Sequence, residues 1–138
     1  MQEQLKRTAG LFELVTGKRM ARFWRAPYGE HNEEIRQWAA ELGYRHIGWT
    51  HGRSADESLD TMDWVSDTTS SAYRSASEIL QRLLRIADGN GAAANGGIVL
   101  MHLGSERRGD EAYQMLPQLI HELRAKEYEI VTVSQLLN

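Results

Sequence analysis

Three places in the sequence put polar side chains beside apolar segments that we expect to be strands. Arg25 follows an apolar-aromatic run, Asp63 and Trp64 lie in a short candidate strand, and His102 directly follows a continuous apolar run. In parallel α/β folds, functional sites gather at the carboxyl ends of the strands. We therefore expect these side chains to be candidates for one pocket.

Each of these residues also has a structural interpretation that its spacing leaves open. Arg25 could form an ion pair at the surface, and Asp63 could be a loop acid beside a packed Trp64 indole. His102 gives the sharpest signal, because a titratable side chain ends a buried apolar run at the edge where sites form. A functional role for His102 is therefore favoured over a purely structural one.

Other candidates for chemistry are weaker. His46 and His51 lie five residues apart across the end of an expected strand, but the sequence shows no third ligand at a suitable spacing, which disfavours a metal site. The glycine-rich segment 89–97 has the composition of a phosphate-binding loop, but it precedes a strand instead of following one. We interpret that segment as a flexible connection.

The apolar spacing predicts helices that alternate with strands. Thr16 and Gly17 give the first helix a stop, Ser75 and Glu78 have capping-box spacing at the start of the third, and Ser134 could cap a short terminal helix. The expected helices cover 5–16, 35–42, 75–86 and 116–123, and the expected strands cover 20–24, 44–50, 61–65, 98–101 and 129–133.

Strands alternating with helices indicate βαβ units and a mostly parallel sheet, so the predicted fold class is α/β. The chain has 138 residues, which fits one domain, and we expect a single domain over residues 1–138.

The composition excludes several classes of protein. Without cysteine, the chain has no disulfide, thiolate metal site or cysteine nucleophile. The formal net charge of −3 disfavours a nucleic-acid-binding protein. No apolar run reaches the length of a membrane span, and the polar N-terminus is not typical of a signal peptide.

Three short motifs, taken in order, resemble the later motifs of a known family. Residues 25–29, Arg-Ala-Pro-Tyr-Gly, resemble an Arg-Pro-Pro-Tyr-Gly loop; residues 60–64, Asp-Thr-Met-Asp-Trp, resemble an Asp-x-x-Asp-Trp motif; residues 100–102, Leu-Met-His, resemble a Leu-x-His motif. Together they resemble the NodB-like polysaccharide deacetylases, a carbohydrate esterase family, over nearly the whole chain.

The resemblance implies a partial (β/α) barrel and a reaction that removes acetyl groups from N-acetylated sugars with a divalent metal, commonly zinc. It implies that His102 is the general acid that protonates the leaving amine, that Asp63 orients and tunes His102, and that Arg25 orients a catalytic aspartate of the family. It further implies that the N–H of Tyr28 stabilises the oxyanion, and that Leu100 and Trp64 shape the pocket for the acetyl methyl group.

The family's early motifs, which supply two aspartates and a His-x-x-x-His pair, have no counterpart in this sequence. We therefore expect that the chain alone binds no metal and is inactive. The sequence departs from the family pattern in two places: Ala26 replaces the usual proline, and the loop 51–59 is longer than the usual connection.

The sequence leaves alternatives open for the biological role. One is a non-catalytic carbohydrate-binding or interaction module built on a half-barrel, and another is a separate chain that supplies the missing half. A half-barrel exposes sheet edges and apolar surface, so a homo-oligomer is expected. The resemblance implies an acetylated polysaccharide or oligosaccharide as the partner, such as peptidoglycan or chitin, and a location in the cell envelope or outside the cell.

Overall fold

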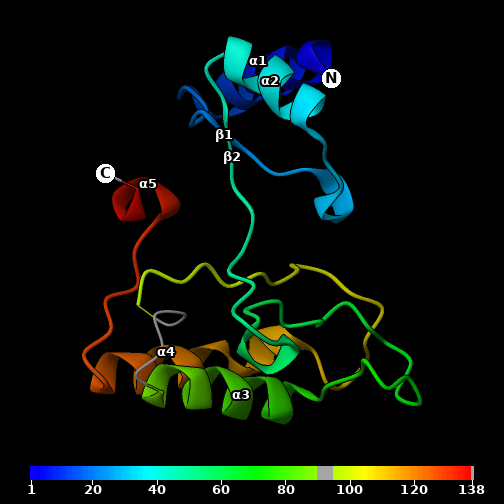
Figure 1. The fold of residues 1–138 in the computed structure, drawn as a ribbon, viewed down its shortest axis with the longest axis vertical. Helices are drawn as coiled ribbons and strands as arrows, with labels where there is room; N and C mark the ends of the chain where they lie inside the picture. Colours follow the sequence, from blue (N-terminus) through cyan, green and yellow to red (C-terminus); the bar gives the residue numbers. More distant parts are fainter. Residues whose placement is uncertain (90–94, 138) are drawn as a thin grey trace. The chain divides into compact units, whose positions relative to one another are not determined.

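The computed structural model describes residues 1–89 and 95–137, so the middle of the glycine-rich segment 89–97 lies outside the described residues (Figure 1). The chain divides into two compact units, Met1–Gly48 and Trp49–Asn138. The expectation of a single domain stays a prediction.

The first unit consists of two helices and a small sheet. Its helices are α1 (Gln2–Thr16) and α2 (Glu33–Glu41), and its strands are β1 (Phe23–Trp24) and β2 (Arg45–His46), with the short 3-10 helix η1 (Pro27–Gly29) after β1. The two strands pair in parallel, as expected for a βαβ unit. The first unit therefore confirms the predicted order of helices and strands.

The ends of these helices follow from their sequence. Gly17 ends α1 with a left-handed backbone (φ 66°), which glycine adopts without steric cost. The side chain of Asn32 accepts a hydrogen bond of 2.8 Å from the N–H of Ile35 and so caps α2. Both helices begin and end within a few residues of their expected positions.

The second unit is built around two helices that lie side by side, α3 (Ala76–Asp88) and α4 (Leu116–Ala125) (Figure 1). The 3-10 helix η2 (Ala55–Glu57) precedes α3, the 3-10 helix η3 (Ala112–Met115) leads into α4, and the last element is α5 (Val133–Leu136). The capping box predicted at Ser75 and Glu78 is present. A core packs between α3, η3 and α4, formed by Leu59, Ile79, Leu80, Leu83, Ala112, Met115 and Leu119.

Three extended segments of the second unit are joined by backbone hydrogen bonds. The N–H of Leu59 donates to the carbonyl of Thr50 (2.8 Å), the N–H of Leu100 donates to the carbonyl of Leu59 (3.0 Å), and the N–H of Thr61 donates to the carbonyl of Leu100 (3.2 Å). Asp60 and Leu100 form an isolated parallel bridge. These bonds bring the segments that carry two of the motifs side by side.

Several expected strands differ from the structure. The expected strands 61–65 and 98–101 are reduced to the bridge at Leu100, because the chain turns at Asp63 instead of continuing extended. The segment 129–133 is not a strand, and Thr132, not Ser134, caps α5. The helices and the small parallel sheet fit an α/β fold, whereas the partial barrel stays a prediction. Among the described helices, none is both long and apolar enough to span a membrane.

The core of the second unit gives a first test. Ile79 is fully buried in it, so Ile79→Ala should lower the free energy of unfolding by about 2–5 kcal/mol, through lost burial and a residual cavity. Ile130→Ala is the matched control, because Ile130 is 51% exposed and should change stability far less. Urea denaturation measures both. Equal losses for the two variants would contradict the core described here.

Candidate active site

The carboxylate of Asp63 contacts His102 in two ways. Its Oδ2 accepts a hydrogen bond of 2.9 Å from the main-chain N–H of His102, and its Oδ1 lies 2.7 Å from the imidazole Nδ1. The Asp63 side chain is 2% exposed, whereas the His102 side chain is 36% exposed. The pair therefore presents an accessible imidazole that is held from behind by a buried acid.

The environment of Asp63 favours its ionised form. Burial of the carboxylate raises its pKa, but the hydrogen bonds from the N–H and imidazole of His102 and from the Thr61 hydroxyl together outweigh burial, so the pKa of Asp63 is lowered. The Thr61 hydroxyl lies 2.9 Å from both Oδ1 of Asp63 and the carbonyl oxygen of Leu100. The fully buried Thr61 hydroxyl therefore lies between the Asp63 carboxylate and the segment that contains Leu100.

The protonation of His102 follows from this contact. An ionised carboxylate can only accept a hydrogen bond, so Nδ1 of His102 must carry the proton that it donates to Asp63. The other ring nitrogen, Nε2, is then the atom that can bind or release a proton toward a substrate. The arrangement suits general acid or base chemistry.

Asp63 lies in a tight turn. The N–H of Val65 donates to the carbonyl of Met62 (3.1 Å), which closes the turn over Asp63 and Trp64. Met62 has a left-handed backbone (φ 54°), a conformation that costs energy in a residue other than glycine. Trp64, the next residue in the turn, is 53% exposed. The turn therefore buries the acid and exposes the indole beside it.

The other predicted site residues lie in different surroundings. Leu100 is buried, and both its N–H and its carbonyl take part in the backbone contacts between the extended segments. Arg25 and Tyr28 belong to the first unit and are exposed, and Tyr28 has a left-handed backbone (φ 58°). The structure thus brings together Asp63, Trp64, Leu100 and His102 in the second unit.

Two buried arginines that the sequence analysis did not identify support the segment 58–65, which contains Asp63. Arg82 of α3 donates hydrogen bonds to the carbonyls of Ser58 and Asp60. Arg107, five residues after His102, donates to the carbonyls of Met62 (3.2 Å) and Val65 (2.8 Å). Arginines that bind carbonyls in this way have no distinguishing local sequence pattern, so no motif could have indicated them.

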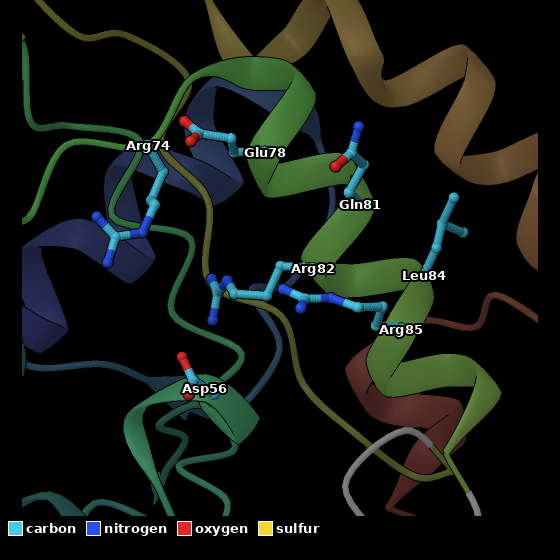
Figure 2. A pocket seen from close by; sticks show the side chains of 7 residues that line it. All are labelled: Asp56, Arg74, Glu78, Gln81, Arg82, Leu84 and Arg85. Carbon is cyan, nitrogen blue, oxygen red and sulfur yellow. The ribbon is translucent and has the colours of Figure 1, made fainter.

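Two hollows lie along α3 and the segment that precedes it. One, of about 570 Å³, is lined by Asp56, Arg74, Glu78, Gln81, Arg82, Leu84 and Arg85. Figure 2 shows the side chains of Arg82 and Arg85 leaving α3 on the side where Asp56 of η2 lies. The other, of about 610 Å³, borders the residues that lead into Asp63 and has Trp49 among its lining residues.

The residues that the structure describes do not fit the divalent metal that the family resemblance implies. Among residues 1–89 and 95–137, no group of three or more histidines or carboxylates is placed to hold a metal ion. The rings of His31 and His46 lie 4.1 Å apart, and the pKa of His46 is lowered by burial and then by the nearby charges of His31 and Arg36. A neutral His46 could bind a metal, but two histidines fall short of the three protein ligands usual at a catalytic zinc. His51 is not part of this pair; its ring contacts Trp49.

The lowered pKa of Asp63 predicts a pH-dependent stability. A carboxylate with a depressed pKa stabilises the fold above its unfolded value of about 3.9, and that contribution is lost as the pH falls through the lower folded value. Asp63→Asn replaces one acceptor oxygen with an NH2 group, which can only donate and would face the N–H groups of His102. The substitution should therefore lower the free energy of unfolding by about 1–3 kcal/mol at neutral pH. The difference from the wild type should shrink in acid.

Urea denaturation over a series of pH values measures this effect. Asp56→Asn is the control, because Asp56 is exposed in η2 and should change stability little at any pH. A penalty for Asp63→Asn that stays the same from neutral to acidic pH would contradict an ionised, hydrogen-bonded Asp63.

Comparisons with known proteins find similarity to polysaccharide deacetylases. A family profile described as polysaccharide deacetylase matches residues 1–47. The chain is 36% identical over 100 residues to a chitin deacetylase of Amylomyces rouxii, a match that covers 69% of this chain and 20% of that protein. This chain thus spans about a fifth of the length of the curated relative. No solved structure matches significantly. Together, these findings show that the chain belongs to the NodB-like polysaccharide deacetylases.

Proposed function

We propose that the chain supplies the proton-donating part of a metal-dependent polysaccharide deacetylase that hydrolyses N-acetyl groups of an acetylated glycan. The observation that carries the proposal is the contact between Asp63 and His102, which occupies Nδ1 and leaves Nε2 for the substrate. The exposed imidazole beside a buried carboxylate is the arrangement that a general acid needs.

The proposed role of His102 lies in the second half of the hydrolysis. Water adds to the amide carbonyl, and the tetrahedral intermediate then collapses as the C–N bond breaks. Protonated Nε2 of His102 donates its proton to the leaving nitrogen, so the products are a free amine on the sugar and acetate. Asp63 stabilises the imidazolium before this transfer and holds the ring in place during it.

The other site residues have roles that the family resemblance supplies. The exposed indole of Trp64 and the buried side chain of Leu100 would shape the pocket for the acetyl methyl group. Arg25 would orient a catalytic aspartate, and the N–H of Tyr28 would bind the oxyanion. The exposure of Arg25 and Tyr28 in the first unit is compatible with both roles.

The family's divalent metal, zinc in this proposal, would activate the water and polarise the carbonyl when bound. The described residues of this chain offer no site for it, so we propose that the chain alone is inactive. The substrate would be peptidoglycan or a chitin-like polymer, which places the activity in the cell envelope or outside the cell. The similarity to a chitin deacetylase supports this choice.

A second candidate function is carbohydrate binding without catalysis. The hollow of about 610 Å³ favours it, because Trp49 offers an aromatic face and Arg53, Ser58 and Asp60 offer hydrogen-bonding groups. Aromatic rings with polar groups around them are a common way to bind sugars. This candidate would place the glycan at Trp49 instead of at Trp64.

A binding experiment separates the two candidates. Tetra-N-acetylchitotetraose, titrated into the labelled chain, should shift the NMR signals of the Trp64 indole and the His102 ring. The fully deacetylated oligomer should shift these signals much less, because it lacks the acetyl group that the site is proposed to bind. Shifts at Trp49 alone would favour the second candidate, and no shift at either tryptophan at millimolar sugar would count against both.

Inactivity is tested separately by acetate release from the same acetylated oligomer, with and without added zinc. We expect no release above that of the His102→Ala variant. Zinc-dependent release by the wild type that His102→Ala abolishes would show that the chain is an enzyme by itself.

We also propose that the chain works as a homo-oligomer or with a chain that supplies the missing part of the barrel. Helix α1 supports this, because Leu14 and Val15 are 80% and 82% exposed on it. Light scattering at micromolar concentration should give a mass above that of one chain. The double substitution Leu14→Ser with Val15→Ser should lower that mass, whereas Glu13→Gln should not. A wild type that is monomeric and folded would contradict self-association.

A further inference from the structure

Arg107 is a buried cation whose donors are spread over three carbonyl groups, with the carboxylate of Asp110 3.5 Å from its Nη1. Its side chain is 1% exposed. Its Nε donates to Val65 (2.8 Å), its Nη1 to Arg74 (2.7 Å) and its Nη2 to Met62 (3.2 Å). The guanidinium also lies over the ring of Tyr73, 4.5 Å from its centre. A planar group with fixed donors can bind several acceptors at once, which a lysine ammonium on a flexible stem cannot reproduce.

Two of these carbonyls belong to the two ends of the turn that contains Asp63. Met62 and Val65 are the first and last residues of that turn, and Met62 is held in a left-handed backbone conformation. Such a conformation persists only where the surroundings enforce it. Arg107 binds the turn at both ends with one rigid group and so enforces its shape.

The shape of the turn sets the direction of the Asp63 carboxylate. Asp63 accepts from the main-chain N–H and the ring of His102 with its two different oxygens, at 2.9 and 2.7 Å. A rotation of the turn would break at least one of these bonds, because both oxygens are committed. Arg107 does not touch His102 in the contacts above; it acts on the ring through Asp63.

We propose that Arg107 is a positioning residue for the His102 acid: by holding the carbonyls of Met62 and Val65, it fixes the Asp63 carboxylate that selects the Nδ1–H form of the imidazole. Its importance for catalysis rests on the proposed function of His102, whereas its effect on the ring does not. Arg82 supports the preceding residues through Ser58 and Asp60, and none of its hydrogen bonds within the described part of the chain reaches the turn itself.

The test is the protonation state of the His102 ring, read from its nitrogen chemical shifts in the labelled chain near neutral pH. In the wild type, the neutral ring should be mainly the Nδ1–H form, since Asp63 accepts from that nitrogen. Arg107→Lys keeps the positive charge but loses the planar guanidinium and its several N–H donors. In this variant, the population of the Nε2–H form should rise at least several-fold. The carboxyl signal of Asp63 should also titrate closer to its ordinary value of about 3.9.

Arg108→Lys is the matched control, because Arg108 is the exposed neighbour and should leave both signals unchanged. A wild-type-like His102 ring in a folded Arg107→Lys chain would overturn the proposal. A second measurement uses the wild type alone. The Arg107 Nε–H should exchange with solvent far more slowly than that of Arg108, and equal exchange rates would also overturn it.

These readouts do not require activity. If Arg107→Lys changes the ring while the chain fails to bind the acetylated oligomer, the positioning role stands and the proposed function falls. If the oligomer binds at Trp64 but Arg107→Lys leaves the ring unchanged, the proposed function stands and the positioning role falls.

Discussion

The carboxylate of Asp63 binds both the main chain and the imidazole of His102, and the geometry of the candidate site depends on this double contact. A carboxylate that is 2% exposed is costly to bury unless its acceptor positions are occupied. Here they are occupied by His102 and by the Thr61 hydroxyl. The requirement to satisfy one buried charge therefore also orients the ring that would do the chemistry.

The backbone around this pair is held by few regular contacts. Asp60 and Leu100 form a single bridge, and the chain leaves the extended conformation at Asp63. Short parallel pairings contribute little stability by themselves. Two side chains bind carbonyls of this segment: Arg82 before the turn and Arg107 at its two ends. Their hydrogen bonds hold the backbone in place of the inter-strand hydrogen bonds that a longer sheet would provide. The site is thus fixed by buried polar side chains more than by a sheet.

The sequence predicted the helices better than the strands, for a physical reason. A helix is marked by local signals such as the capping box of Ser75 and Glu78, which satisfies its own first N–H groups. A strand needs a partner that local spacing does not show, and so 129–133 was wrong as a strand. Motif order indicated Asp63 and His102 together. Arg107 could not be found, since nothing in the sequence distinguishes it from the exposed Arg108.

The pairing of Asp63 with His102 also defines what this part of the site can and cannot do. Proton donation to the leaving nitrogen comes after water has added to the carbonyl, so a general acid has nothing to act on until that addition occurs. Addition to an amide needs an activated water and a polarised carbonyl. The described residues orient and expose an acid but hold no metal-ligand cluster. In the proposed function, proton delivery and water activation are separate tasks, and Asp63 and His102 would serve the first.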